Sequence, residues 1–217
     1  MATKLYAVIL ADVMASGGRK RLRPLLRRLL RRASEAHRRR KFILLPYAVT
    51  AGDEFESITD HLEKIPWLLL DLRSRVQPIK LRIGVGIGEV DGKVASPVNQ
   101  MDGAAFRMAR QAVDGLKRAR KNAALTAFRS VNEEFDQTAN LIYGLQDTLV
   151  RKITEKQWQA VTARIEHDSL QETARALGLD DSTVSRNLKR GYYGQLVAAA
   201  YGMEQVIGEQ FPIKAAS

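Results

Sequence analysis

The chain of 217 residues carries a net charge of +11, 45% apolar residues and no cysteine. Its length suits one large domain or a medium domain with a small one, its apolar share suffices for a buried core, and the lack of cysteine excludes disulfides and thiolate metal sites. No stretch is typical of a signal peptide or of a membrane span, so we expect a cytoplasmic, soluble protein.

Apolar runs and helical spacing predict the elements of the first 130 residues. We expect strands over 4–12, 42–50, 54–58, 79–90 and 123–128, a hairpin turn at Gly52 and Asp53, and helices over 20–41, 60–76 and 102–121. The order βαββαβ is typical of a ferredoxin-like fold, an antiparallel sheet covered by helices on one face.

The helix expected over 20–41 holds most of the charge. Residues 19–41 contain twelve Lys or Arg and one Glu, a net charge equal to that of the whole chain. Leucines and alanines recur there on one stripe, with Pro24 in the first turn. The arginines either form a solvated face or bind the phosphates of DNA, RNA or a membrane.

Glycines alternate with branched residues in the strand over 79–90. Gly84, Gly86 and Gly88 share one face, and Ile83, Val85 and Ile87 share the other. The glycines lie inside a strand and not at a strand-to-helix turn, so they do not form a dinucleotide-binding loop. Their face permits close approach of either a packed helix or a ligand.

Asp12 and Asp53 lie at the ends of expected strands. Two neighbouring carboxylates can hold Mg²⁺, which takes one or two of them and completes its shell with phosphates. The pair suggests a nucleotide site with Mg²⁺ or Mn²⁺, and the alternative is that both carboxylates only shape turns. The histidines, His37, His61 and His167, are far apart in the sequence, which favours surface residues over a zinc site.

Motifs around these aspartates resemble the class III nucleotidyl cyclase and diguanylate cyclase (GGDEF) superfamily. They are Asp12-Val13, Gly52-Asp53-Glu54-Phe55, the strand from Arg82 to Glu89 and the helix from Asp102 to Arg110. With its C-terminal region, the whole chain most resembles the SatD family of bacterial proteins. The resemblance implies an α+β fold, in which a ferredoxin-like palm of the nucleotidyl-cyclase type carries an all-α C-terminal helix-turn-helix domain.

The same resemblance implies roles for particular residues. Asp12 and Asp53 match metal ligands, and Arg110 matches an arginine that stabilises transition-state charge, with a surface salt bridge as the alternative. The residues that match the phosphate loop and the hairpin are Val13, Met14, Ala15, Ser16, Gly17 and Gly52.

Three positions depart from the cyclase pattern. Phe106 replaces the asparagine that fixes the ribose, Val49 replaces the lysine that recognises the base, and Ala51 replaces the first glycine of the diguanylate cyclase hairpin. These departures favour binding of a nucleotide or second messenger over catalysis, because positioning of the reacting groups supplies much of phosphoryl transfer. The alternative is an active nucleotidyl cyclase or related phosphoryl-transfer enzyme.

Helical spacing dominates after residue 130. A connecting helix over 131–153 is expected to link the palm domain, residues 1–130, to a C-terminal domain, residues 154–217. Thr154 and Gln157 are expected to cap the next helix. Two short helices, 170–179 closed by Gly178 and 182–190, then form a helix-turn-helix pattern. A small residue is needed at Ala174 because the second helix crosses there, and the small core is expected to contain Leu170, Leu177, Leu179, Val184 and Leu188.

The second of these helices is expected to bind DNA, since the pattern resembles the DNA-binding helices of sigma factor region four. Its exposed face carries Ser182, Thr183, Ser185, Arg186, Lys189 and Arg190, which suit phosphates and base edges in the major groove. The alternative is a helical hairpin used only for dimerisation. Residues 151–217 carry nine basic and eight acidic residues, so strong binding requires a homodimer or the basic helix. A last helix over 192–207 is expected to pack on this module or on a second copy.

Overall fold

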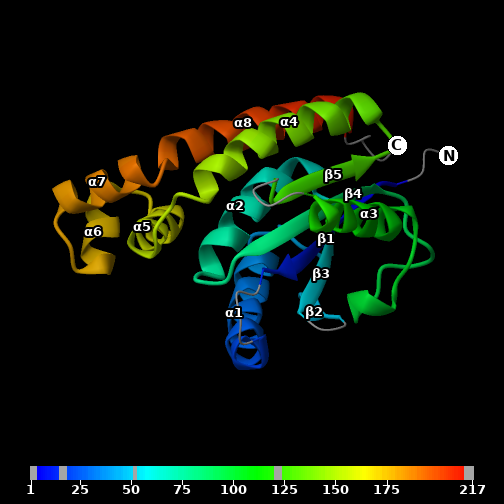
Figure 1. The fold of residues 1–217 in the computed structure, drawn as a ribbon, viewed down its shortest axis with the longest axis horizontal. Coiled ribbons are helices and arrows are strands. Elements are labelled where there is room, and N and C mark those ends of the chain that lie inside the picture. The colour runs from blue at the N-terminus through cyan, green and yellow to red at the C-terminus, as the bar shows by residue number, and fades with distance from the viewer. Residues whose placement is uncertain (1–3, 15–18, 51–52, 120–123, 213–217) are drawn as a thin grey trace.

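The computed structural model describes residues 4–14, 19–50, 53–119 and 124–212, and has a mixed α+β fold (Figure 1). The strands are β1 Tyr6–Val13, β2 Ala48–Val49, β3 Glu54–Thr59, β4 Leu81–Gly88 and β5 Thr126–Ser130. The α-helices are α1 Arg19–Arg39, α2 Ile65–Arg75, α3 Ala104–Arg118, α4 Glu133–Val150, α5 Glu155–Glu166, α6 Leu170–Leu177, α7 Asp181–Arg190 and α8 Tyr193–Gln210. Short 3-10 helices are η1 Leu62–Lys64 and η2 Val98–Gln100. No helix in the described ranges is long and apolar enough to cross a membrane.

The five strands form one sheet with β1 at its centre. The strand order is β2-β3-β1-β4-β5. β1 pairs antiparallel with β3 and with β4, and β2 pairs antiparallel with β3. β5 pairs parallel with β4, so the prediction of a wholly antiparallel sheet is wrong at this edge. The reason is that α3 connects the two strands as a crossover, and a crossover returns the chain to the same end of the sheet.

Helices cover both faces of the sheet. On one face α1, α2, α4 and α8 share a core with Ala7, Ile9 and Ala11, while on the other α3 shares a core with Val8 and Leu10 (Figure 1). The prediction of helices on a single face is therefore wrong, because α3 packs on the second face. The alternation also places the side chain of Asp12 on the α3 face of the sheet.

The glycine face of β4 is packed against α3. A Cβ added at Gly86 would lie 2.1 Å from the carbonyl oxygen of Ala105, and one added at Gly84 would lie 2.5 Å from that of Ala109. The structure thus selects close helix packing over a ligand surface for these glycines. Because α3 lies this close to the sheet, Lys117 near its C-terminal end reaches the end of β1 and the start of β3.

The strand predicted over 42–50 is mostly absent, since only β2 is in strand conformation. Pro46 has no N–H to donate to a neighbouring strand, and the N–H of Tyr47 is donated to Ser34 Oγ at 3.0 Å. The chain still runs beside β3, because Leu44 N–H donates to the Ile58 carbonyl at 2.8 Å. In α1, Pro24 lies inside the helix and not in its first turn as predicted.

The C-terminal helices build a second apolar cluster and then return to the first. Trp158 of α5, Ala174 of α6 and Val184 of α7 are buried together in this cluster. α8 begins there, but its later residues, including Met203 and Ile207, lie in the core beside the sheet. The expectation that α8 packs on the helix pair before it is therefore met only at the beginning of α8, and packing on a second copy stays a prediction. The predicted division at residue 154 stays a prediction.

His37, near the end of α1, is fully buried, contrary to the expectation of a surface histidine. Its Nδ1 lies 2.8 Å from the hydroxyl oxygen of Tyr47, and its Nε2 lies 3.1 Å from Oδ2 of Asp71 on α2. Burial lowers the pKa of His37 below its ordinary value of 6.5, which favours a neutral ring. Burial alone would raise the pKa of Asp71, but His37 and Arg75 together hold it below its ordinary value.

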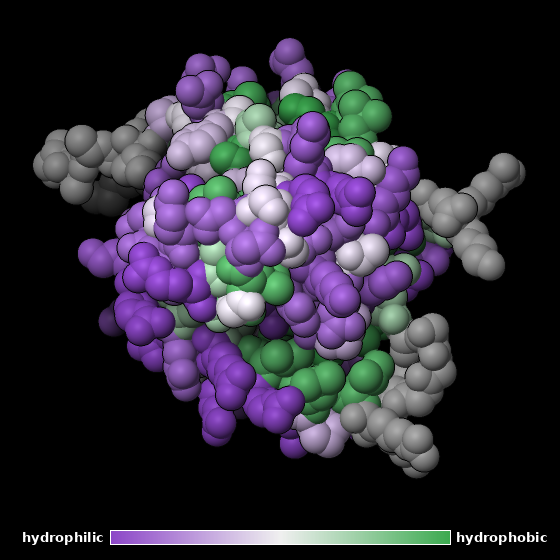
Figure 2. All heavy atoms as spheres, turned by 90° about the vertical axis from the view of Figure 1, so that its left-hand side faces the viewer, coloured by the Kyte–Doolittle hydropathy of each residue, from purple (hydrophilic) through white to green (hydrophobic). Residues whose placement is uncertain are grey.

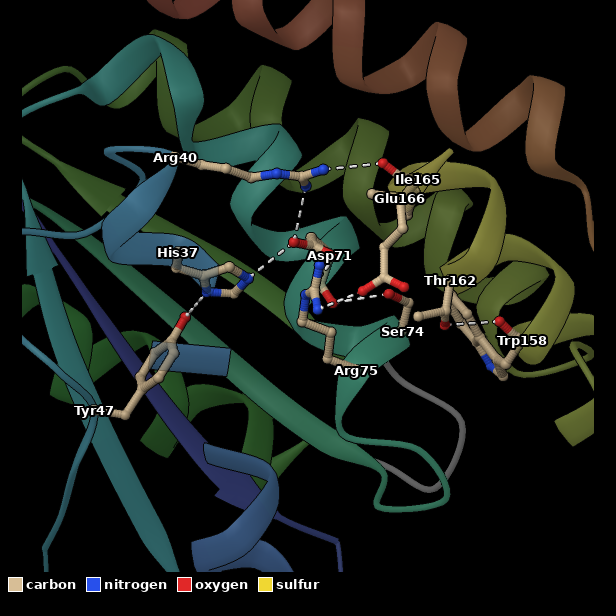
Figure 3. A network of polar contacts seen from close by, with 10 residues as sticks. All are labelled: His37, Arg40, Tyr47, Asp71, Ser74, Arg75, Trp158, Thr162, Ile165 and Glu166. Atoms are coloured by element: carbon tan, nitrogen blue, oxygen red, sulfur yellow. Dashed lines mark hydrogen bonds and ion pairs between the residues drawn. The ribbon is translucent and has the colours of Figure 1, made fainter. Parts of the chain in front are cut away.

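Two arginines extend this network to α5 (Figure 3). Arg40 donates to Asp71 at 3.2 Å and to the carbonyl of Ile165 at 3.0 Å. Arg75 lies 2.9 Å from Asp71 and 2.8 Å from Glu166. Ile165 and Glu166 are the last residues of α5, so the network fixes the position from which the chain enters α6.

Candidate functional site

Local hydrogen bonds fix both ends of α6. Glu172 N–H donates to Ser169 Oγ at 3.1 Å, and Ser169 N–H donates to the Glu172 carboxylate at 3.2 Å, which is a capping box. At the other end Gly178 has a φ of 63°, and Leu179 N–H donates to the Ala174 carbonyl at 3.0 Å. This left-handed conformation favours glycine and turns the chain into α7.

Asp180 caps the start of α7. Its carboxylate accepts from Thr183 N–H at 2.8 Å and from the Thr183 hydroxyl at 2.7 Å, and the Ser182 hydroxyl donates to it as well. These bonds from Ser182 and Thr183 hold the pKa of Asp180 well below its ordinary value. Two of the predicted DNA contacts, Ser182 and Thr183, are thus already used to hold the cap.

The core between α6 and α7 is small and extends into the neighbouring helices. Ala174, Val184 and Leu188 are buried, with Leu170 and Leu177 partly buried against them. The expected Leu179 is absent from this core, since it is 44% exposed. The reason is its place directly after Gly178, where the chain has already left α6. The remaining core residues leave one side of α7 for solvent.

The outer side of α7 is polar and basic. Ser182, Ser185, Arg186, Lys189 and Arg190 are exposed, and Thr183 is partly exposed. Arg186 is held in place, because its Nε donates to the Ser182 carbonyl at 3.2 Å and its Nη2 to the Thr183 hydroxyl at 3.1 Å. Figure 2 shows the side of the molecule on which α5, α6 and α7 lie, where hydrophilic residues cover most of the surface.

A second basic surface lies on α1. Its exposed arginines include Arg27, Arg28, Arg31, Arg32, Arg38 and Arg39. Three of them, Arg27, Arg31 and Arg38, line a groove of about 320 Å³ whose other side is formed by Pro46, Tyr47 and Val49. The predicted buried stripe is confirmed by Leu26, Leu30 and Ala33. The choice between a solvated face and a phosphate-binding face stays a prediction.

Acidic and basic side chains meet where the end of β1 and the start of β3 lie beside the C-terminal half of α3. Asp12 is paired with Glu54 across these strands. Asp12 lies 3.1 Å from Arg82 and 3.4 Å from Lys117, and Glu54 lies 2.6 Å from Arg110 and 2.5 Å from Lys117. We name these five residues the charge cluster. Lys117 joins both carboxylates, so the cluster is one connected network.

The charge cluster includes residues to which the motifs assign no role. The motifs named Asp12 and Arg110 as site residues but not Arg82, Glu54 or Lys117 as their partners. Burial alone would raise the pKa of Glu54, but hydrogen bonds from Lys117 and Arg110 hold it below its ordinary value. Burial opposes the charge on Lys117, but Glu54 and Asp12 together raise its pKa. The pairings thus outweigh burial and favour the charged forms of Glu54 and Lys117.

Asp53 lies next to the cluster, 3.4 Å from Nε of Arg23 on α1. Its carbonyl accepts from Val13 N–H at 3.3 Å, and Met14 N–H donates to the Lys80 carbonyl at 2.8 Å. These two predicted phosphate donors are therefore already bonded within the protein. The other predicted loop and hairpin residues, Ala15, Ser16, Gly17 and Gly52, and Ala51 beside them, lie outside the described residues.

The acidic residues present restrict the kind of metal site that fits. In the ranges that the structure describes, no three or more His, Asp or Glu side chains are grouped so that they could hold a metal ion. Asp12 and Asp53 offer two carboxylates, which is enough only when phosphate oxygens complete the shell. Asp12 also keeps Arg82 and Lys117 beside it. Asp53 faces Arg23 of α1, so in this structure each of the two carboxylates is paired with cations.

Two of the positions that depart from the cyclase pattern lie in apolar surroundings. Phe106 of α3 is partly buried and packs against the apolar cluster under that helix. Val49 of β2 packs against the core on the opposite face. Neither side chain can donate or accept a hydrogen bond, so neither replaces the polar group that the cyclases have there.

Comparisons with known proteins identify the family of this chain and include a solved structure with a weak likeness. A comparison with curated proteins gives no match. Among solved structures, the crystal structure of a regulator of polyketide synthase expression from Bifidobacterium adolescentis is 13% identical, covers 98% of this chain and 83% of that chain, and has a TM-score of 0.28. That TM-score is too low for the likeness to carry an argument. The family model described as the SatD family matches residues 6–192, and the chain therefore belongs to the SatD family.

Proposed function

We propose that this protein is a DNA-binding regulatory protein in which α6 and α7 form a helix-turn-helix and α7 enters the major groove. The observation that carries the proposal is the combination of a capped, sharply turned helix pair with an exposed face containing Arg186, Lys189 and Arg190. Recognition helices contact base edges and phosphates with such residues. Arg186 is already held by two hydrogen bonds, which reduces the entropy lost on binding.

Electrostatics limits how strongly one such module can bind. Each Lys or Arg that neutralises a phosphate releases counterions, and most non-specific affinity comes from this effect. The C-terminal region is almost neutral, whereas residues 19–41 account for the whole net charge. We therefore assign sequence reading to α7 and propose that the exposed arginines of α1 add phosphate contacts on the same or a neighbouring segment of DNA.

The double substitution Arg186→Ala with Lys189→Ala is expected to abolish selective DNA binding. Genomic fragments recovered with the wild-type protein should be enriched at discrete sites, and each lost base or phosphate contact should cost about 1–3 kcal/mol. The matched control is Lys93→Ala with Arg107→Ala, which removes the same charge from exposed positions outside α5–α7 and should keep the enrichment. Uniform weak recovery of any duplex by the wild type would contradict the proposal.

A second candidate function is binding of a nucleotide or second messenger with Mg²⁺ or Mn²⁺ at the charge cluster, in a palm of ferredoxin-like type. Three cations, Arg82, Arg110 and Lys117, surround two carboxylates there. A bound metal would be held by Asp12 and Asp53 and would neutralise phosphate charge. Arg82, Arg110 and Lys117 would then bind phosphate oxygens in exchange for the carboxylates, since an arginine can pair with either group.

Calorimetry with the four nucleoside triphosphates and Mg²⁺ or Mn²⁺ tests this second function. The wild type is expected to bind at least one of them, and Asp12→Asn or Asp53→Asn should weaken binding by about tenfold or more, which is 1.4 kcal/mol. Asp91→Asn, an exposed residue in the loop after β4, is the control and should bind like the wild type. No heat with any triphosphate would reject the candidate. A cyclic or linear product that Asp53→Asn eliminates would favour the enzyme instead.

A further inference from the structure

The solvent-facing side of α4 carries a regular stripe of residues. Its positions alternate in spacing between four and three, which is the spacing of the contact positions in a coiled coil. Five of them, Glu134, Thr138, Leu141, Leu145 and Thr148, lie on α4, the sixth, Lys152, lies in the turn directly after it, and all six are exposed. Leu141 and Leu145 are 67% and 64% exposed, although the opposite side of α4 buries Phe135, Ala139 and Tyr143 in the core. The stripe is apolar at its centre, polar on both sides of it and charged at its ends.

This stripe is complementary to itself when two α4 helices run antiparallel. A two-fold axis near Tyr143 places Leu141 opposite Leu145 of the second copy and Thr138 opposite its Thr148. The same register places Glu134 opposite Lys152 of the second copy. Such an isologous contact makes every pair occur twice. Gly144 lies next to the centre, and a Cβ added there meets nothing within 4 Å, so the backbone of a second helix can come close.

Charge selects the antiparallel arrangement. The first turn of α4 is acidic, with Glu133 and Glu134, and the basic Lys152 follows its last turn. A parallel pair would place like charges side by side, whereas the antiparallel pair places each acidic end beside a basic one. The helix dipoles of an antiparallel pair also oppose one another favourably. A register that satisfies apolar, polar and charged positions at once is specific to a second copy of this chain.

We infer that α4 is the interface of a symmetric homodimer of this protein, formed by antiparallel packing of the stripe on its counterpart. The inference goes beyond the proposed function and does not depend on it, because the contact uses no residue of α7 or of the charge cluster. It places the two α6–α7 units at opposite ends of the helix pair. They are thus separated by at least the length of α4, about 27 Å for its 18 residues.

Sedimentation of purified wild-type protein and stripe variants tests the apolar centre. The wild type is expected to sediment as a dimer, and Leu141→Glu or Leu145→Glu as a monomer, with dimer affinity reduced about 100-fold or more because charged residues would face one another in an apolar contact. Both variants should keep the wild-type circular dichroism spectrum and unfold cooperatively, since both side chains are exposed, with a melting temperature lowered only by the loss of dimerisation. Val131→Glu is the matched control, because Val131 is 64% exposed but lies outside the stripe.

Charge reversal tests the register. Glu134→Lys alone and Lys152→Glu alone should each weaken the dimer about tenfold, because like charges then face one another across the pair. The double variant Glu134→Lys with Lys152→Glu should regain the wild-type affinity. A monomeric wild type, a dimer that Leu141→Glu leaves intact, or a double variant as weak as its parents would overturn the inference.

Discussion

Gly86→Ala is expected to lower the free energy of unfolding by about 3 kcal/mol or more, because the new methyl group has no space. Its carbon would lie 2.1 Å from the carbonyl oxygen of Ala105 and 2.3 Å from the backbone nitrogen of Ala109. Both are backbone atoms of α3, so no side chain can rotate away. The whole helix has to move from the sheet, and a loss of this size is a large part of the stability of an ordinary domain.

Gly115→Ala is the matched control for this substitution. Gly115 lies on the exposed side of the same helix, and an added Cβ meets nothing within 4 Å. Alanine is preferred over glycine in a helix interior, so this variant should be as stable as the wild type or gain up to about 1 kcal/mol. Urea denaturation of the two variants measures the difference. Equal midpoints for Gly86→Ala and the wild type would show that β4 and α3 are not in close contact.

Asp147→Ala is expected to cost about 3–5 kcal/mol, because it leaves a buried arginine without its carboxylate. The Asp147 side chain is 2% exposed and lies 3.7 Å from Nη2 of Arg73, whose own side chain is 8% exposed. Asp147 also accepts hydrogen bonds from the N–H groups of Leu125 and Thr126, at 2.6 Å and 2.7 Å. The substitution removes the acceptor of both groups at the start of β5.

Two further variants separate charge from hydrogen bonding at this position. Asp147→Asn keeps one carbonyl oxygen as acceptor and should lose less than Asp147→Ala. Glu133→Ala changes an exposed acidic residue in the first turn of the same helix and should cost less than about 1 kcal/mol. Thermal unfolding monitored by circular dichroism ranks the three. A melting temperature for Asp147→Ala equal to that of Glu133→Ala would refute the argument.

The sequence predicts the local features of this fold well. The helix over 170–179 with its stop at Gly178 is confirmed, as is the capping box of Thr154 and Gln157. These signals are local, since a cap needs only residues three or four positions apart. The strands β1, β3 and β4 also lie close to where an apolar run, the hairpin turn and the alternation of glycines with branched residues predict them.

Local errors are few, such as the strand expected over 42–50, and the errors in sheet topology and site partners concern contacts between distant parts of the chain. Nothing local in β5 shows that it pairs parallel with β4, and nothing local in α3 shows which face of the sheet it covers. The partners of Asp12 follow the same rule, because Arg82 and Lys117 reach it only through sheet pairing and helix packing. The burial of His37 was missed because its partner Asp71 lies on another helix.

The path of α8 makes completion of the sheet core depend on a segment that follows α5, α6 and α7 in the chain. Met203 and Ile207 of α8 and Phe211 after it fill the core beside Phe135 of α4, and a ribosome adds them only after it has made α5, α6 and α7. The core beside the sheet therefore stays incomplete until α5, α6 and α7 have been made, although domains commonly fold as units during synthesis. A chain truncated after α7 lacks these core residues, so its sheet core is unfinished.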